Sequence, residues 1–184
     1  MKRTHLTSWH FLLILAAVVL FLTDRNSPSA PQTHAPDPSW QVYFSPNGGA
    51  TTGIVETLDR AGESILVQAY SFTSAPISEA LVRAHKRGVA VQVILDRSQR
   101  TEKYSAADFL ANSGIITRID AAHAIAHDKV MIIDEKTVIT GSFNFTKAAE
   151  KRNAENLLII RSNELAAQYV VNWQIHQRHS TPFR

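Results

Sequence analysis

SILVQAYSFTSAPISEALVRAHKRGVAVQVIL, residues 64–95, predicts a strand, a helix and a second strand in succession. The apolar runs 64–70 and 89–95 have the length of buried strands. Between them, four apolar residues recur at helical spacing: Ile77, Ala80, Leu81 and Ala84. Gly88 ends the helix, which we expect at about 75–87. A strand–helix–strand unit places two parallel strands side by side, so these residues predict a parallel sheet covered by helices.

Shorter patterns on both sides extend this alternation. Upstream, the sequence predicts a strand at 41–44 and a helix at 52–61. Downstream we expect a helix, a strand, a hairpin, another strand and a final amphipathic helix, in this order: Ala106–Ala111, Ile115–Ile119, Val130–Ile133 with Thr137–Thr140, Glu155–Arg161, and the segment around Leu165, Tyr169 and Trp173. The hairpin adds antiparallel strands. The prediction is therefore an α/β fold with a mixed, largely parallel β-sheet flanked by helices, one domain per chain.

Composition limits the chain to one domain and excludes cysteine chemistry. The 184 residues are 45% hydrophobic, which is enough to build one core and little more. The sequence has no cysteine, so disulfides, thiolate metal sites and a cysteine nucleophile are excluded. The formal net charge is +3, and the first 25 residues, with three basic side chains and one acidic one, account for two of those charges. Binding of a polyanion would therefore depend on local basic clusters.

The first 30 residues differ in kind from the rest. A basic N-terminus precedes the uninterrupted apolar run Phe11–Leu22, and small residues follow. This order predicts a secretory signal peptide, since a membrane span needs about 20 apolar residues. Pro31 makes the cleavage position poor, so an N-terminal inner-membrane anchor remains an alternative. We expect a Pro-rich linker at 31–39, a domain at 40–184, and an exported protein that is periplasmic or secreted.

The stretch HDKVMIIDEKTVITGSFNFTKAAEKRNAEN, which begins at His127, contains the side chains best suited to catalysis. His127, Lys129 and Asp134 follow the spacing HxKxxxxD. In a strand beginning near His127, the imidazole and the Lys129 ammonium would share one face. Ser142 and Asn144 repeat the two-residue spacing. An ammonium and neutral donors can hold the oxygens of a phosphodiester, while an imidazole attacks phosphorus or moves protons.

These motifs resemble those of the phospholipase D superfamily, in which HxKxxxxD is followed by GSxN. Within that family, the sequence is similar to the small bacterial endonucleases that carry a single copy of the motif. Similarity extends upstream through FSPNGG, AYSFTSAPISEALVRAHKRGVAVQVILD and ANSGI, so it covers nearly all of Trp40–Trp173. The resemblance implies a phospholipase D-type α-β-α sandwich, and hydrolysis of phosphodiesters without a metal ion or cofactor.

The resemblance also implies a role for each matched residue. His127 resembles the nucleophile that forms a covalent phosphohistidine. Lys129 and Asn144 are similar to the phosphate ligands of the family, and Ser142 to the hydroxyl beside them. Glu155 matches the acidic residue that bonds the far nitrogen of the histidine, where a carboxylate orients the ring and stabilises the imidazolium.

Three further residues have a structural interpretation beside the chemical one. Asp134 matches the motif aspartate and is counted with the catalytic set. Its position in a turn predicts pairing in or near that turn rather than proton transfer. Phe143 and Phe145 alternate with the polar pair of GSFNFT, so we expect them to fill the core beneath the site.

The remaining histidines have weaker chemical signals. His176 and His179 have a helical spacing that could bind a metal ion, but no third ligand accompanies them in the sequence. We expect them at an exposed helix end. His123 precedes His127 by four residues and is expected in a solvated loop.

A single HxKxxxxD motif has a consequence for assembly. The resemblance implies that two histidines are needed, one to attack phosphorus and one to protonate the leaving oxygen. Chains with one motif in this family pair two subunits and build one site between them. The sequence therefore predicts a homodimer with a two-fold axis and both His127 side chains facing one phosphate.

Basic residues around the motif favour a nucleic acid as substrate. We expect these side chains to grip its backbone, although an ordinary solvated face would look the same: Arg97, Arg100, Lys103, Lys147, Lys151 and Arg152. The sequence predicts a DNA endonuclease with little sequence specificity, with RNA left open. The alternatives are a membrane-tethered phospholipase D-type lipid phosphodiesterase and a binding module without activity.

Overall fold

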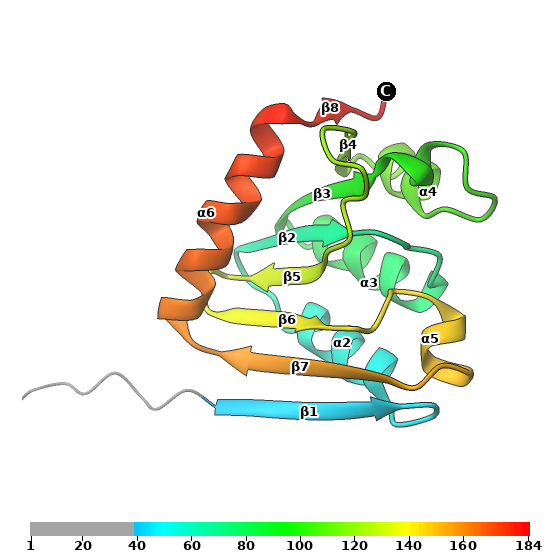
Figure 1. Cartoon of the computed structure of the whole chain (residues 1–184). Coiled ribbons are helices and arrows are strands. Elements are labelled where there is room, and N and C mark those ends of the chain that lie inside the picture. Colours follow the sequence, from blue (N-terminus) through cyan, green and yellow to red (C-terminus); the bar gives the residue numbers. More distant parts are fainter. Residues whose placement is uncertain (1–38) are drawn as a thin grey trace, which may run out of the picture. The chain divides into compact units, whose positions relative to one another are not determined.

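An eight-stranded sheet organises residues 39–184, the part of the chain that the computed structural model describes (Figure 1). In chain order the strands are β1 (Ser39–Ser45), β2 (Ser64–Ala69), β3 (Ala90–Asp96), β4 (Ile116–Asp120), β5 (Lys129–Ile133), β6 (Thr137–Gly141), β7 (Glu155–Arg161) and β8 (Thr181–Pro182). In the sheet they follow the order β1-β7-β6-β5-β2-β3-β4-β8. The predicted export segment, and all but the last residue of the predicted linker, lie outside the described residues.

The sheet is mixed, as predicted, but the prediction of a largely parallel sheet is wrong. Only the pairs β2–β3 and β3–β4 are parallel, as the strand–helix–strand pattern required. The other five pairs are antiparallel. The reason is that β5, β6 and β7 form an antiparallel meander. At the two edges of the sheet, β1 runs antiparallel to β7 and β8 runs antiparallel to β4.

Helices cover both faces of the sheet, which confirms the predicted sandwich. Their bounds are α2 (Ala50–Asp59), α3 (Ala75–Lys86), α4 (Ala107–Asn112), α5 (Lys147–Lys151) and α6 (Asn163–His179), with a 3-10 helix η2 (Arg97–Arg100) after β3. The larger core lies under α2, α3 and α4 and includes Leu81 and Met131. On the other face, α6 packs Trp173 against Val130 and Val138.

Trp173 shows how α6 is attached to the sheet. Its side chain is 2% exposed, and the indole N–H donates to the carbonyl of Val67 on β2 at 3.1 Å. A buried indole needs such an acceptor, because an unpaired polar group in the core would destabilise the fold. Burial and hydrogen bond together fix α6 on the sheet, where it crosses the strands from β6 to β4 (Figure 1).

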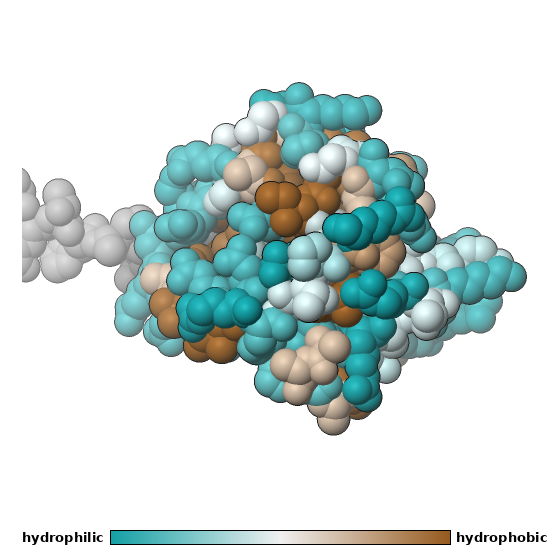
Figure 2. All heavy atoms as spheres, turned by 90° about the horizontal axis from the view of Figure 1, so that it is seen from above, coloured by the Kyte–Doolittle hydropathy of each residue, from teal (hydrophilic) through white to brown (hydrophobic). Residues whose placement is uncertain are grey.

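The face of the molecule seen from above is largely hydrophilic (Figure 2). Viewed from above, it shows small hydrophobic patches separated by hydrophilic side chains (Figure 2). Between residues 39 and 184, every helix is too short or too polar to cross a membrane.

Candidate active site

The strand ends that carry the motif residues meet at one edge of the sheet. Ala69, the last residue of β2, lies opposite Lys129, the first residue of β5. Ser45 ends β1 opposite Glu155, where β7 begins. β6 ends at the same edge with Gly141. The antiparallel meander thus brings the ends of the HxK and GSxN segments together, although 13 residues separate Ser142 from Lys129.

Lys129 supplies a buried positive charge at this edge. The residue is 7% exposed, and its ammonium donates to the carbonyl of His127 at 2.8 Å. It also lies 5.3 Å from the centre of the Tyr70 ring. Burial lowers the pKa of Lys129, and the charges of Asp128 and Glu155 only partly offset that effect. An ammonium with few partners in the protein is suited to bind an anionic oxygen.

His127 is exposed and lies in the loop two residues before β5, which begins near it as predicted. Its ring packs against Tyr70, with ring centroids 4.6 Å apart. Tyr70 directly follows β2 and therefore touches both His127 and Lys129. Sequence analysis assigned it no role, although its place after the carboxyl end of a parallel strand is a common position for ligand-binding side chains.

The GSFNFT loop depends on Gly141. This residue has φ +149°, and a Cβ placed there would lie 2.3 Å from the carbonyl oxygen of Asn156. That close approach lets the same carbonyl accept hydrogen bonds from the N–H groups of Ser142 and Phe143, at 3.1 and 3.2 Å. A glycine is required because any larger side chain would push the loop away from β7.

Glu155 binds Ser142 and Asn153 rather than His127. Its carboxylate accepts from the Ser142 hydroxyl at 2.6 Å and from the Asn153 amide at 2.9 Å. The predicted bond from Glu155 to His127 is absent from the hydrogen bonds of residues 39–184. The reason is topological: β6 lies between β5 and β7, and two strand spacings amount to about 10 Å. Within one chain, Glu155 therefore orients Ser142.

The two phenylalanines of the loop lie in the core, as predicted. Phe143 and Phe145 are fully buried. Between them, Asn144 has a buried side-chain oxygen without a hydrogen-bond partner in the described part of the chain. Buried polar atoms are rarely unpaired, so this amide has unused hydrogen-bonding capacity. A side chain of this kind fits the predicted role as a ligand of the substrate.

Asp134 lies at the opposite end of β5 from His127, about 16 Å along the strand from Lys129. Asp134 and Glu135 have positive φ values and form the turn between β5 and β6. The Asp134 carboxylate accepts the backbone N–H groups of Gly62, Glu63 and Ser64 at 3.0, 2.8 and 2.9 Å. These contacts confirm the structural role expected for a turn residue. Because Asp134 lies far from His127 and Lys129, its inclusion in the predicted catalytic set is wrong.

The contacts of Asp134 predict an effect on stability. Burial raises the pKa of Asp134, but the three backbone donors outweigh it and hold the net pKa below its ordinary value. Replacing Asp134 with asparagine should lower the free energy of unfolding by about 2 kcal/mol at neutral pH, since hydrogen bonds to a charged group are among the stronger ones. Urea denaturation of the two proteins measures this difference.

The pH dependence of that difference has a definite sign. Because the folded-state pKa is depressed, the stabilisation is complete above the unfolded-state pKa of about 3.9 and is lost as the pH falls through the lower folded-state pKa. The gap between wild type and Asp134→Asn should therefore shrink on acidification. Glu135→Gln, in the same turn, is the matched control and should change little. An equal gap at neutral and acidic pH would contradict this role.

The basic residues predicted to grip a polyanion have different surroundings. Arg97 is exposed on η2, just after the end of β3. Arg100 stacks on Phe183 and donates to its carbonyl, so the C-terminal segment already holds it. Lys151 bonds Asn47 at 3.2 Å, whereas Lys147 is exposed at the start of α5. Arg97 and Lys147 are the better placed of these residues to meet a substrate.

A single HxKxxxxD motif, at the edge of a mixed sheet with helices on both faces, defines the class of single-domain chains with the phospholipase D fold. Residues 54–174 match the family model described as "Cardiolipin synthase, PLD-like domain". The chain therefore belongs to the phospholipase D superfamily, and the predicted family and fold class are confirmed.

Individual relatives agree with this assignment. Phospholipase D of Rickettsia felis is 52% identical over 130 residues, which are 71% of this chain and 65% of that protein. Phospholipase D of Rickettsia bellii is 41% identical over 179 residues and covers 89% of each chain. The crystal structure of Nuc, a phospholipase D family member from Salmonella typhimurium, shares 44% sequence identity. It covers 80% of this chain and 99% of that chain, with a TM-score of 0.77.

Proposed function

We propose that the chain is a phosphodiesterase that hydrolyses DNA with little sequence specificity and without a divalent metal ion. The observation that carries the proposal is that the exposed His127 ring and the buried ammonium of Lys129 both lie against the ring of Tyr70. An accessible imidazole can attack phosphorus, and a fixed positive charge beside it stabilises the charge that develops on the phosphate oxygens. Phosphoryl transfer requires mainly positioning and charge stabilisation.

The proposed reaction has two displacements. A ring nitrogen of His127 attacks phosphorus, a P–N bond forms, and the P–O bond to the leaving oxygen breaks. A second imidazole protonates that oxygen. The same imidazole then removes a proton from water, whose oxygen attacks phosphorus as the P–N bond breaks and His127 is released. Lys129 and Asn144 hold the nonbridging oxygens through both steps.

The second imidazole must come from outside the single motif. We propose a two-fold dimer in which His127 of the partner subunit performs this proton transfer. The exposure of His127 supports the proposal, because the ring is open to another chain. Apolar side chains exposed around the α6 side of the sheet also support it, since an uncovered apolar surface of this kind suits association: Trp40, Val42 and Phe44 on β1, Val171 and Ile175 on α6, and Ile125 before His127.

The β1 residues of this set face the same side as α6. Trp40 lies directly opposite Ile160, which in turn lies opposite Val138 of the core beneath α6. Side chains alternate along a strand, so Val42 and Phe44 point to that side as well. Of the three, Phe44 lies nearest the edge that carries the candidate active site, one residue before the end of β1.

A charge on this surface should break the dimer. Phe44 is 66% exposed, so Phe44→Glu should leave the fold intact while placing a carboxylate in the proposed interface. We expect a monomer by sedimentation velocity, and cleavage reduced by at least about 100-fold because each site lacks its acid. Phe109→Glu, on α4 across the sheet, is the matched control and should stay dimeric. A fully active monomer would exclude the shared site.

A lipid phosphodiesterase is the second candidate, because the Rickettsia relatives bear the name phospholipase D and the family model the name cardiolipin synthase. The same groups could attack a phospholipid headgroup. Arg97 and Lys147, exposed near the edge, favour the longer polyanion. The periplasmic or secreted location of the protein remains a prediction from residues 1–30. An exported enzyme would meet nucleic acid outside the cytoplasm.

One experiment separates the candidates. The full chain is incubated in excess EDTA with plasmid DNA, single-stranded DNA, RNA, and vesicles of phosphatidylcholine with cardiolipin. We expect cleavage of DNA that declines steeply as salt rises, since phosphate contacts release counterions. Headgroup release without nucleic-acid cleavage would replace the nuclease proposal with the lipid one.

A further inference from the structure

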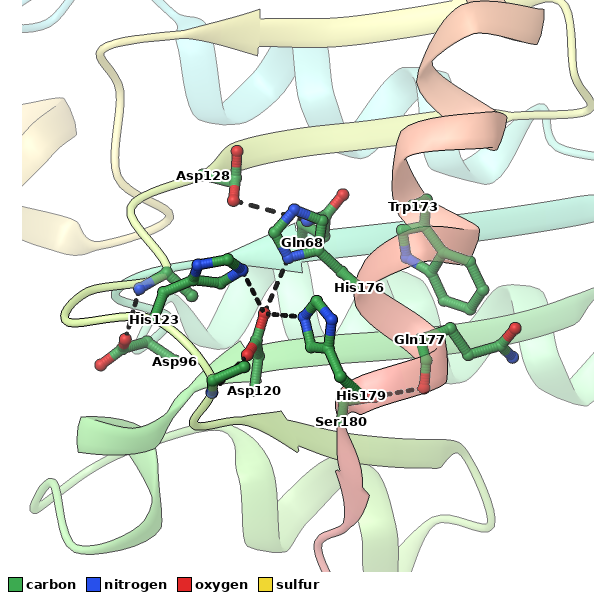
Figure 3. A network of polar contacts seen from close by, with 12 residues as sticks. Gln68, Asp96, Asp120, His123, Asp128, Trp173, His176, Gln177, His179 and Ser180 are labelled. Atoms are coloured by element: carbon green, nitrogen blue, oxygen red, sulfur yellow. Dashed lines mark hydrogen bonds and ion pairs between the residues drawn. The ribbon is translucent and has the colours of Figure 1, made fainter.

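A second cluster of ligand-type side chains lies around Asp120 (Figure 3). Asp120 ends β4, His123 lies in the following loop, and His176 and His179 lie in the last turn of α6. Each offers one nitrogen or oxygen atom, and these four atoms lie within 4.8 Å of one another. The helix end is partly exposed, as expected, but further ligand-type side chains come from β4 and its loop, segments distant in the sequence.

The Asp120 Oδ2 atom lies close to a nitrogen of each of the three imidazole rings. From the Asp120 Oδ2 atom, the distances are 2.7 Å to His176 Nδ1, 3.1 Å to His179 Nε2 and 3.9 Å to His123 Nε2. Ligands bound to Zn²⁺ at about 2.0–2.1 Å in a tetrahedron lie about 3.3–3.4 Å apart. Small side-chain rotations would equalise the three distances around that value.

The carboxylate of Asp120 is oriented for this purpose. Asp120 is 1% exposed, and its Oδ1 atom accepts the backbone N–H of Ala122 at 2.9 Å. The Oδ2 atom is left to face three imidazole rings, whose centroids are 5.1, 5.2 and 5.2 Å apart. A buried carboxylate is costly unless positive charge is near. A backbone donor that fixes the second oxygen is typical of the support around metal ligands.

We propose that Asp120, His123, His176 and His179 bind one Zn²⁺ ion. Three imidazole nitrogens and one carboxylate oxygen suit zinc, whereas Ca²⁺ and Mg²⁺ prefer sets of oxygen ligands. Four ligands from the protein fill the coordination sphere and leave no position for a reacting water, which is typical of a structural site. Binding requires a free lone pair on each ligand nitrogen, so the N–H protons that face Asp120 shift to the other ring nitrogen or are released.

The position of the site indicates what the ion does. His176 and His179 lie in the last turn of α6. Asp120 and His123 lie at the start of the loop that leads to His127, and His127 follows His123 by four residues. A zinc ion would join the end of the helix to this loop and hold the segment that precedes the candidate nucleophile. It would stabilise the fold without taking part in phosphodiester chemistry, so this inference is independent of the proposed nuclease activity.

Zinc binding can be measured without any substrate. The full chain is freed of metal with a chelator, dialysed, and titrated with Zn²⁺ against a chromophoric competitor. We expect one high-affinity ion per chain, and an increase in Tm of about 10 °C at free zinc near 1,000 times Kd. Co²⁺ in the same site should give the intense visible absorption of a tetrahedral complex.

Variants of the exposed histidines test the proposed zinc site, because replacing an exposed side chain should not unfold the protein. The His123 side chain is 48% exposed, so His123→Gln should fold normally yet bind zinc at least about 100-fold more weakly. His179→Gln should behave alike, whereas His85→Gln on α3, and His127→Ala, should bind as wild type does. Zinc binding that survives in His123→Gln and His179→Gln, a weak Co²⁺ spectrum of octahedral type, or no stoichiometric zinc in wild type would each overturn the proposal.

Discussion

Replacing His127 with alanine should lower kcat/KM for DNA cleavage by at least about 10⁴-fold, because the nucleophile and, in a dimer, the proton donor are lost together. The exposed ring contacts Tyr70 and supports little of the core, so the variant should fold and retain the Tm of wild type. Its affinity for uncleaved DNA should also persist, because Lys129 and the exposed basic residues remain. Initial rates on a labelled duplex in excess EDTA measure the effect.

The control for this variant is a histidine away from the edge. His85 lies on α3, so His85→Ala should keep the wild-type rate within a small factor. Equal cleavage by wild type and His127→Ala would show that another nucleophile, or another protein in the preparation, performs the reaction. Affinity without turnover in both proteins would identify the chain as a binding module.

Lys129→Met should lower kcat/KM by about 10²–10³-fold, the usual loss when one fixed donor to a developing anionic charge is removed. Methionine replaces the apolar stem of the side chain almost in full but removes the ammonium and its charge. Lys136→Met, in the turn at the other end of the β5–β6 hairpin, is the matched control. The Lys136 ammonium pairs with Glu63 at the surface, and its loss should leave cleavage unchanged. Equal losses in both variants would indicate a general charge effect.

The pH profile gives an independent test of Lys129. Burial lowers its pKa, so its ammonium loses the proton at a lower pH than the ordinary value of about 10.4. Activity that needs the ammonium should therefore fall on the alkaline side below that pH. Lys129→Arg, which stays charged, should be less active near neutrality but should lack this alkaline fall. An identical alkaline limb in both proteins would assign it to another group.

Much of the fold could be predicted because buried apolar residues recur every two residues in a strand and every three to four residues in a helix. The predicted strand at Glu155–Arg161 matches β7, and the predicted helix from about Ala75 ends one residue later than α3. Elements without an apolar period were missed. β8 has two exposed residues, and the five-residue helix α5 depends on the Thr146 cap. The proportion of antiparallel pairs was misjudged because sequence patterns do not show how edge strands join a sheet.

The candidate site could be predicted only as far as its motifs extend. The HxK and GSxN segments meet at one edge of the sheet because a short hairpin joins them, and the pocket lined by His127, Lys129, Ser142 and Asn144 stays a prediction. The partners of Glu155 could not be predicted, because they depend on β6 lying between β5 and β7. Contacts between distant segments were missed for the same reason, and the histidine cluster around Asp120 is the largest of these omissions.

The stereochemistry at phosphorus distinguishes attack by His127 from direct attack by water. A duplex with one chiral phosphorothioate is cleaved by the full chain in ¹⁸O-labelled water with excess EDTA, and the configuration of the product is determined. Each in-line displacement inverts phosphorus, so attack by His127 followed by attack of water must give net retention, even when the intermediate does not accumulate. The account predicts retention with the wild-type chain. Net inversion would mean that water attacks the phosphodiester directly, and the covalent role of His127 would be wrong.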